Sequence, residues 1–407
     1  MPLHLTRLTL REIRLPLREP FRISSGVVDT RRILLLELTD ADGVSVWSEC
    51  VADALPNYSP ETVDTCWLAI TEWVAPRVLG AAFARPEEVH PALERDFRGH
   101  HMAKAAVEMG LWALTARRDD VPLALLVAGA AHGAPAPRDA IETGISLGIQ
   151  ASPDALVERA RAALAAGYRK VKIKVEPGRD VDYVRAAREA LGPGAPLMAD
   201  ANNAYTLADP AHVRALEGLD ALGLMMIEQP LAHDDLVRHA QLQRRLRTPV
   251  CLDESITSLE RAEDMLALDA GRIVNVKPGR VGGFAQSVAI HDACAAAGVP
   301  VWCGGMLESG VGRAYNVALA SLPNFTKPGD VSPSARYWAR DVVTPEWTMS
   351  AGGLVRVPLD RPGLGVDVDV GRIDDLTVRA ATLGAGGRVG TTTGARERVG
   401  TPRPAGA

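Results

Sequence analysis

Cysteine is scarce in this 407-residue chain, and its arrangement excludes two kinds of stabilised protein. There are five cysteines, an odd number, and no pair has CxxC spacing. Neither a disulfide framework nor a thiolate zinc site is indicated. We therefore expect buried, unpaired thiols at Cys50, Cys66, Cys251, Cys294 and Cys303.

Long apolar runs and an excess of positive charge are also missing. No stretch approaches the roughly 18 to 20 continuous apolar residues that span a bilayer, and residues 1–7 lack the charged-then-apolar order of a secretory signal. The formal net charge of −5 offers no basic field to hold nucleic acid. These absences predict a cytoplasmic protein with no nucleic-acid or membrane partner.

The pattern that is present changes near residue 140. Before it, strand-like runs at residues 33–38 and 47–51 precede helical patterns over about residues 61–115. After it, short β-rich runs alternate with helical stretches, and the runs end about every 24 to 28 residues. That spacing fits one strand, loop and helix, so it predicts an α/β barrel that follows a mixed first domain.

Two lysines share one face of a predicted barrel strand. In KVKIKV, residues 170–175, lysines and β-branched residues alternate with period two. In an antiparallel sheet this would indicate an exposed edge strand. A barrel strand is covered on both faces, where an ammonium is costly unless it is paired or used. Because barrel active sites lie at the carboxyl ends of strands, Lys172 and Lys174 are candidate catalytic residues.

Acidic residues end the next three apolar runs, at Asp200, Glu228 and Asp253. Each alone would most simply be a helix cap or a solvated loop acid. At successive strand ends of one barrel they converge, and their mutual repulsion in a low dielectric calls for a cation. Three carboxylates with room for water and substrate suit Mg²⁺.

A further lysine, Lys277, ends the run at residues 272–277. A metal flanked by strand-end lysines on opposite sides of a barrel mouth combines a Lewis acid for a carboxylate with a base for the adjacent carbon acid. The residues therefore predict proton abstraction next to a carboxylate.

Five motifs occur in a fixed order: KIK at 172–174, DAN at 200–202, IEQP at 227–230, LDES at 252–255 and NVKPGRVGG at 275–283. This order resembles the muconate-lactonizing subgroup of the enolase superfamily. Within that subgroup, PFRIS at 20–24, GHHMAK at 99–104 and GGMLESGVGR at 304–313 look like the o-succinylbenzoate synthase and N-acylamino acid racemase family. The similarity covers about residues 3–368.

The resemblance implies a modified TIM (β/α)7β barrel with an α+β amino-terminal capping domain. We expect the cap, with its specificity loops, at residues 1–135, the barrel and active site at 136–345, and a segment packing back on the cap at 346–382. Residues 383–407 are rich in Gly, Thr, Arg and Pro and should form a disordered tail.

The resemblance also implies roles for the strand-end residues. Asp200, Glu228 and Asp253 would bind Mg²⁺, for which Mn²⁺ or Co²⁺ can substitute. Lys174 would be the general base, and Lys277 would face it across the substrate. Pairing of such a base with Mg²⁺ at an ene-diolate is the general pattern of the superfamily. Lys172 would lower the pKa of Lys174 and bind the substrate carboxylate.

Other positions are implied to support the site or to contact substrate. Arg280 would lower the pKa of Lys277 and so favour racemisation. A mobile loop at residues 21–26, with Tyr58, would screen the site from water. The full set of substrate-binding or supporting candidates is Asn202, Glu254, Ser146, Arg280, Gly304, Met306, Glu308, Phe21 and Tyr58.

The implied activity is that of a carbon-oxygen lyase: the Mg²⁺-dependent syn dehydration of a 2-succinyl-6-hydroxycyclohexadiene-1-carboxylate to o-succinylbenzoate, through an ene-diolate, in menaquinone biosynthesis. The close alternative is an N-acylamino acid (N-succinylamino acid) racemase, and one protein can perform both reactions. An alternative of another class is a catalytically inactive barrel with a binding role. We expect a small-molecule carboxylate substrate and a homo-oligomer.

Overall fold

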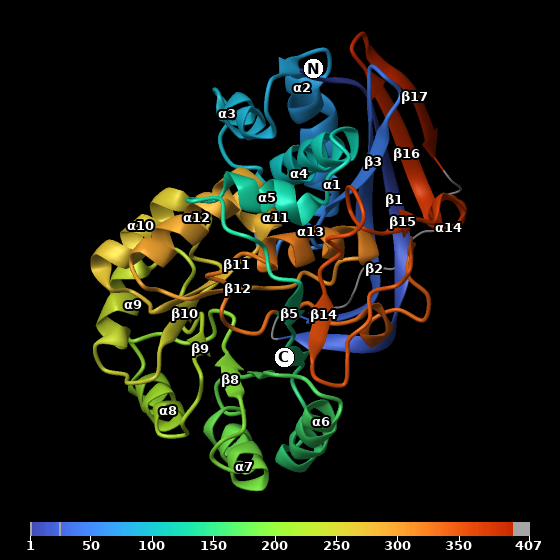
Figure 1. The fold of residues 1–407 in the computed structure, drawn as a ribbon. Helices are drawn as coiled ribbons and strands as arrows, with labels where there is room; N and C mark the ends of the chain where they lie inside the picture. The colour runs from blue at the N-terminus through green and yellow to red at the C-terminus, as the bar shows by residue number, and fades with distance from the viewer. Residues whose placement is uncertain (1, 24–25, 394–407) are drawn as a thin grey trace.

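The computed structural model describes residues 2–23 and 26–393 of the chain. Its two parts are an antiparallel sheet with attached helices and a curled parallel sheet ringed by helices (Figure 1). This architecture confirms the predicted α/β barrel with an α+β capping domain.

The capping sheet takes its strands from both ends of the chain. Its order is β17-β16-β1-β2-β3, all antiparallel, and β4 pairs with the start of β1. Consecutive leucines of β2, such as Leu34 and Leu35, are fully buried, because both faces of this strand are covered. The strands are β1 (Leu3–Ile23), β2 (Gly26–Asp40), β3 (Ser45–Cys50), β4 (Ala82–Phe83), β16 (Thr377–Gly384) and β17 (Gly387–Thr393).

Helix α4 is the core of the capping domain. Fourteen of its residues are buried, and Gly110 allows it to lie against the sheet, since a Cβ there would come within 2.7 Å of Leu38. Figure 1 shows α4 and α5 between the sheet and the barrel helices. The helices are α1 (Val63–Ala69), the π-helix η1 (Ile70–Val74), α2 (Ala75–Val78), the 3-10 helix η2 (Pro86–Glu88), α3 (Val89–Glu94), α4 (His101–Arg118) and α5 (Leu123–Ala130).

The parallel sheet has seven strands that pair in chain order, so each βα unit lies next to the one before it. Lys172 and Met198 are paired across neighbouring strands, as are Lys174 and Asp200. The strands are β6 (Ile145–Leu147), β7 (Val171–Lys174), β8 (Leu197–Asp200), β9 (Ile227–Glu228), β10 (Val250–Leu252), β11 (Ile273–Val276) and β12 (Val301–Cys303).

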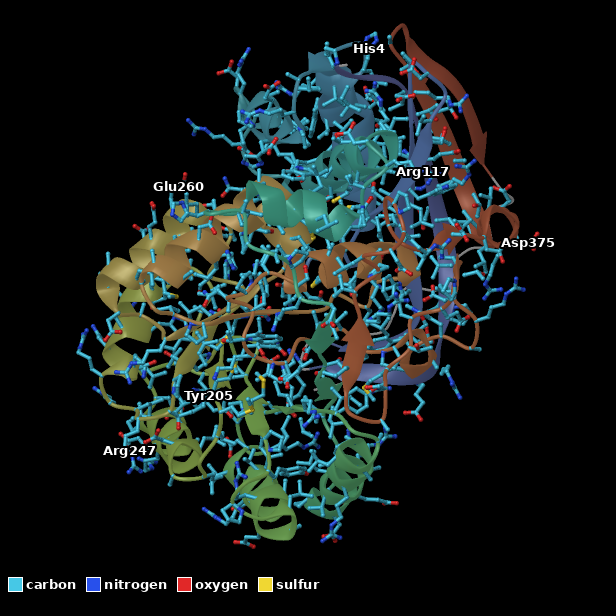
Figure 2. All side chains as sticks on the ribbon, in the orientation of Figure 1. His4, Arg117, Tyr205, Arg247, Glu260 and Asp375 are labelled. Atoms are coloured by element: carbon cyan, nitrogen blue, oxygen red, sulfur yellow. The ribbon has the colours of Figure 1, made fainter. Side chains whose placement is uncertain are left out.

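Helices on the outside connect these strands. Several begin at a residue whose side chain accepts a hydrogen bond from the first helical turn, among them Ser152, Asp209 and Ser258. Charged side chains such as Arg247 and Glu260 lie on this outer ring (Figure 2). The helices are α6 (Pro153–Ala165), α7 (Val181–Leu191), α8 (Pro210–Asp220), α9 (Leu236–Gln243), α10 (Leu259–Leu268), α11 (Pro278–Val281), α12 (Phe284–Ala296) and α13 (Gly310–Ala320).

The gap between the first and last strands of this sheet is closed by a short segment at Gly329 and Asp330. The Asp330 amide donates to the Cys303 carbonyl at 2.9 Å, and the Gly144 amide donates to the Gly329 carbonyl at 2.6 Å. Gly329 also forms a parallel bridge with Thr143. In the part of the chain that the structure describes, the eighth barrel position is thus a bridge and not a regular strand.

The carboxyl-terminal segment returns to the capping sheet, where β16 pairs with β1. The prediction that disorder begins at residue 383 is wrong, because β17 continues the sheet as the partner of β16. Backbone pairing along this hairpin does not need large apolar side chains; residues 394–407 lie outside the described residues. The remaining elements are β5 (Ala140–Glu142), η3 (Ser334–Arg336), β13 (Val343–Thr344), β14 (Leu354–Arg356), β15 (Asp367–Val368) and α14 (Val370–Leu376).

One continuous apolar core runs through both domains, and a second small cluster fills the barrel interior around Trp302 and Met226. All five cysteines are buried and unpaired, as predicted. Among the described residues, no helix is long and apolar enough to cross a membrane.

Candidate active site at the carboxyl ends of the barrel strands

The curled sheet gathers the predicted charged residues at one end of the barrel. Lys172 and Lys174 lie on β7, while Asp200 and Glu228 end β8 and β9. Asp253 follows β10, and Lys277 follows β11. The three carboxylates are at most 1% exposed. Parallel strands end at the same edge, which is why residues far apart in sequence meet here.

On one side of the site, the two lysines of β7 hold Asp200. Lys174 Nζ lies 2.6 Å from Asp200 Oδ2 and donates to Asn202 Oδ1 at 2.6 Å. Lys172 Nζ lies 3.1 Å from Asp200 Oδ2 and 3.2 Å from Glu228 Oε2. The alternation of lysines along β7 therefore directs both ammonium groups toward the carboxylates.

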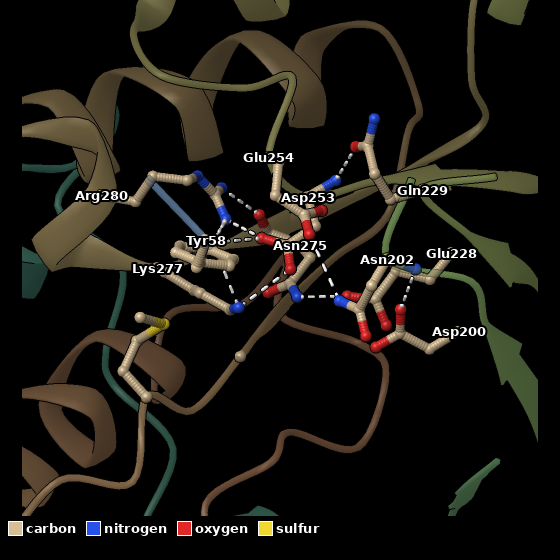
Figure 3. Close-up of polar contacts among 12 residues, drawn as sticks. Tyr58, Asp200, Asn202, Glu228, Gln229, Asp253, Glu254, Asn275, Lys277 and Arg280 are labelled. Carbon is tan, nitrogen blue, oxygen red and sulfur yellow. Dashed lines mark hydrogen bonds and ion pairs between the residues drawn. The ribbon is translucent and has the colours of Figure 1, made fainter. Parts of the chain in front are cut away.

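On the opposite side, Asp253 is surrounded by Lys277, Arg280 and Tyr58 (Figure 3). Lys277 Nζ is 2.8 Å from Asp253 Oδ2, and the Tyr58 hydroxyl donates to Asp253 Oδ1 at 2.8 Å. Lys277 also lies over the Tyr58 ring, 4.4 Å from its centroid. A residue of the capping domain thus reaches the barrel lysine, which is consistent with the prediction that Tyr58 covers the site.

Arg280 lowers the pKa of Lys277, as expected, but the net lowering that would favour a neutral lysine is not found. Burial by itself would lower the pKa of Lys277, but Asp253 and Tyr58 outweigh it, so the net shift of the pKa is upward. Arg280 points at Asp253 and donates to the Ile256 carbonyl at 2.7 Å. Its repulsion of Lys277 is a minor influence because its guanidinium is committed to the carboxylate between them.

Glu228 is the least neutralised carboxylate of the row. Burial and the neighbouring Asp200 raise the pKa of Glu228 to about 8, and Lys172 only partly offsets them. Asn275 donates to its Oε1 at 2.7 Å. Nearby, burial and Asp253 raise the pKa of Glu254 to about 7. A cation bound beside these buried carboxylates would stabilise their ionised form.

The donor chemistry of this row fits a hard divalent ion. Asp200, Glu228 and Asp253 are buried carboxylates on three successive strand ends, and oxygen ligands are what Mg²⁺ takes in proteins. Within the described residues, no three His, Cys, Asp or Glu side chains are placed so that together they could hold a metal ion, because the carboxylate oxygens face lysines. A bound cation would replace part of that pairing.

Asn202 and Glu254 are joined by a hydrogen bond. Asn202 Nδ2 donates to Glu254 Oε1 at 3.2 Å, and Asn203 donates to the same oxygen at 3.2 Å. The second carboxylate oxygen of Glu254 is buried without a partner among the described residues. This free acceptor and the contact of Asn202 with Lys174 fit the predicted supporting role of both residues.

Gly304 and Met306 lie in the loop after β12, and Ser146 lies on β6 beside Lys172. A Cβ at Gly304 would come within 2.3 Å of Asn275 Oδ1 and 2.6 Å of Lys277 Cε, so glycine leaves room for the lysine. The buried Ser146 hydroxyl has no partner within the described parts of the chain.

One carboxylate oxygen of Glu308 is used within the protein. Its Oε1 accepts hydrogen bonds from the Met306 amide at 2.7 Å and from Asn316 Nδ2 at 2.8 Å. Glu308 therefore shapes the loop that carries Gly304 and Met306. The backbone of Phe21 lies in β1, but its side chain and residues 24–25 of the predicted mobile loop lie outside the described residues.

Sequence reasoning missed three residues that hold the site. Asn275 shares a face of β11 with Ile273 and Lys277, so the period-two pattern could have identified it. Gln229 accepts from the Asp253 amide at 3.0 Å and thereby fixes the loop after β10. Asp330 lies 2.8 Å from Lys172 Nζ, but it follows no recognisable strand pattern in the sequence.

Two family models match the chain, and together they span most of it. The model described as the mandelate racemase / muconate lactonizing enzyme N-terminal domain matches residues 5–128, and the enolase C-terminal domain-like model matches residues 155–372. The chain belongs to the enolase superfamily.

Curated relatives place this superfamily member near two named activities. It is 47% identical over 377 residues to the o-succinylbenzoate synthase of Geobacillus kaustophilus, covering 93% of this chain and 97% of the relative. It is 42% identical over 381 residues to the N-succinylamino acid racemase of an Amycolatopsis species, covering 94% and 100%.

A solved structure from the superfamily agrees with the fold. A member from Listeria innocua superposes with a TM-score of 0.87 at 36% identity, covering 94% of this chain and all of the other. The curated relatives are enzymes, and superfamily members use a divalent metal. These findings support an enzyme and not an inactive barrel.

Proposed function

We propose that this enzyme dehydrates 2-succinyl-6-hydroxycyclohexadiene-1-carboxylate to o-succinylbenzoate and also racemises N-succinylamino acids. The first activity would serve menaquinone biosynthesis. One observation carries the proposal: Lys174 and Lys277 lie at opposite ends of a row of three buried carboxylates, in a chain that is 47% identical to a named o-succinylbenzoate synthase. Both reactions begin with removal of a proton next to a carboxylate.

In this proposal each charged residue has one task. Asp200, Glu228 and Asp253 would hold Mg²⁺, which supplies Lewis acidity toward the substrate carboxylate. Lys172 would bind that carboxylate, since it is an ammonium fixed on the same strand as Lys174. Mn²⁺ and Co²⁺ also accept oxygen ligands and would substitute.

For dehydration, Lys174 is the residue that moves the proton. Its neutral amine takes the α-proton of the substrate, and the resulting ammonium then gives a proton to the departing hydroxyl on the same face. A syn elimination therefore needs one lysine. Lys277 supplies a positive charge beside the cyclohexadiene ring of the substrate, where negative charge develops when the proton is removed.

Racemisation is the second candidate activity, because it needs a base on each face of the α-carbon. Lys174 ends β7 and Lys277 follows β11, and these two strands are separated by the three strands that carry the carboxylates. Identities of 42% and 45% to two N-succinylamino acid racemases favour this activity alongside dehydration. The capping-domain residue Tyr58 would help exclude water while the substrate is bound.

Metal removal tests the shared part of the proposal. Treatment with EDTA should abolish both activities, and Mg²⁺ or Mn²⁺ should restore them. Replacement of Asp200, Glu228 or Asp253 by its amide should weaken both Mg²⁺ binding, measured by calorimetry, and turnover. Full activity of the metal-free enzyme would contradict the metal assignment.

The cytoplasmic location and the homo-oligomer stay predictions, to be checked by fractionation and sedimentation.

A further inference from the structure

Asp330 is a buried carboxylate at the point where the barrel closes. Its amide donates to the Cys303 carbonyl, and its neighbour Gly329 bridges to Thr143. The Asp330 side chain is 7% exposed. Backbone pairing on both sides thus fixes the place from which this carboxylate reaches the barrel interior.

Two lysines of the strand run KVKIK share the Asp330 carboxylate. Lys172 Nζ lies 2.8 Å from Asp330 Oδ2, and Lys170 Nζ lies 3.2 Å from Asp330 Oδ1. Lys170 is fully buried and lies 3.4 Å from the centroid of the Trp302 ring. A Cβ at Gly144 would come within 2.6 Å of Lys170 Cε, so Lys170 has little room to move.

Lys172 is within ion-pair distance of three carboxylates, and they are not equivalent. Asp200 and Glu228 are the two that the proposed function assigns to the metal. Asp330 is the third and has the shortest distance to Lys172. When oxygens of the first two serve a cation, Asp330 remains as the counter-charge of Lys172 among the described residues.

We propose that Asp330 is a positioning residue that holds the Lys172 ammonium by an ion pair. Lys172 then stays directed at the substrate carboxylate while Asp200 and Glu228 hold the metal. The fixed pair of Lys170 and Trp302 keeps Asp330 oriented. This inference deepens the proposed function and rests on it for the role of Lys172.

A double-mutant cycle tests the anchor. Asp330→Asn should lower kcat/KM for both substrates about 10- to 100-fold, as loss of a partner behind a site residue typically does. In a Lys172→Met background the same substitution should have almost no further effect, because its target is gone. An undiminished loss in the Lys172→Met background would overturn the proposal.

The same cycle on unfolding gives a readout that does not depend on turnover. In urea denaturation the two residues should be coupled by at least about 5-fold in the unfolding equilibrium constant, and the coupling should persist at saturating Mg²⁺. Coupling that disappears with Mg²⁺ would contradict the anchor. If the wild-type enzyme turns over neither substrate, the proposed function fails, while this measurement still decides whether Asp330 holds Lys172.

Matched variants separate anchoring from loss of a buried acid. Asp341 is another buried carboxylate of the same segment, and it accepts from the Gly310 and Val342 amides. Asp341→Asn should lower stability and leave kcat unchanged.

If Asp330→Asn does not fold, Lys170→Met/Asp330→Asn removes one charge of each sign and is compared with Lys170→Met alone. Equal kcat/KM in that pair would also overturn the proposal.

Discussion

At the scale of single residues, Lys174 and Lys277 differ in what surrounds them. Lys174 contacts Asp200 and Asn202 beside the strand end of β7. Lys277 is enclosed by Asp253 and by the capping-domain residue Tyr58. The two amines therefore approach the space above the carboxylates from different sides.

This difference gives a prediction about the two faces of the substrate. Lys174→Ala should abolish dehydration because it removes the base. Lys277→Ala should retain α-proton exchange in deuterium oxide for the N-succinylamino acid enantiomer that Lys174 serves, and lose it for the other. Proton NMR of each enantiomer measures the exchange. Equal residual exchange of both enantiomers in each variant would show that the two-face assignment is wrong.

Gly304 gives a second prediction at this scale. The Cβ of Gly304→Ala would overlap Asn275 and Lys277, so the lysine must move. Racemisation should fall by about 10- to 100-fold, since small displacements of positioned groups carry costs of that order. Chiral chromatography of the products measures the rate.

The control for Gly304 is Gly129→Ala in α5, where a Cβ meets open space. That variant should keep its activity and gain slightly in stability, because alanine has the higher helix propensity. A Gly304→Ala enzyme with wild-type racemisation would mean that the loop yields more readily than Lys277.

At the scale of secondary-structure elements, two buried glutamates of the capping domain cap barrel helices. Glu108 of α4 accepts from the Phe284 and Ala285 amides at 2.8 and 3.0 Å, at the start of α12. Glu49 of β3 accepts from the Ser309 and Gly312 amides at the start of α13. Carboxylates are favoured at helix amino termini. These contacts attach the capping domain to the barrel.

Replacement of one of these caps should loosen that attachment. Burial raises the pKa of Glu108 to about 7, so the test belongs at pH 8, where the carboxylate is ionised. All three groups that contact it are donors, including Trp112 Nε1 at 2.7 Å. In Glu108→Gln the new side-chain NH2 group faces one of these N–H donors, which loses its acceptor. The substitution should lower the unfolding free energy by about 1 to 3 kcal/mol.

Urea denaturation measures the loss in Glu108→Gln. The exposed Glu217 of α8 provides the matched control, and Glu217→Gln should change stability by less than about 0.5 kcal/mol. Equal stability of the two variants would show that the cap contributes nothing.

At the scale of the whole molecule, one buried histidine links the folding equilibrium to pH. The Leu231 amide donates to His239 Nε2 at 3.2 Å, and His239 Nδ1 lies 2.6 Å from the Asp235 carbonyl. Nε2 must therefore be unprotonated. Burial lowers the pKa of His239 to about 4, below the value near 6.5 of an unfolded histidine.

The sign of this linkage follows from the lowered pKa. Between pH 6.5 and about 4 the unfolded chain binds a proton that the folded protein excludes, so stability falls as the pH decreases. His239 therefore changes the unfolding free energy by at most about 1.4 kcal/mol per pH unit. His239→Gln should flatten the pH dependence of urea denaturation in this window. The exposed His233, changed to Gln, should leave it unaltered; a wild-type slope in both variants would contradict the assignment.

The sequence by itself determined the barrel and its charged strand ends. Period-two alternation placed Lys172 and Lys174 on one face, and a repeat of one βα unit placed Asp200, Glu228 and Asp253 at successive strand ends. These features are local, because each can be recognised within a single strand or a single repeat. Since the parallel strands pair in chain order, residues at successive strand ends lie close together.

The tertiary structure alone decided the contacts between distant segments. Asp330 reaches Lys172 across 158 residues of sequence because the barrel closes at Gly329 without a strand-like pattern, and Tyr58 reaches Lys277 because the capping domain is attached there. The hairpin of β16 and β17 forms where composition indicated disorder, since backbone pairing needs no apolar side chain. No periodicity encodes such pairings; they depend on which surfaces the folded chain brings together.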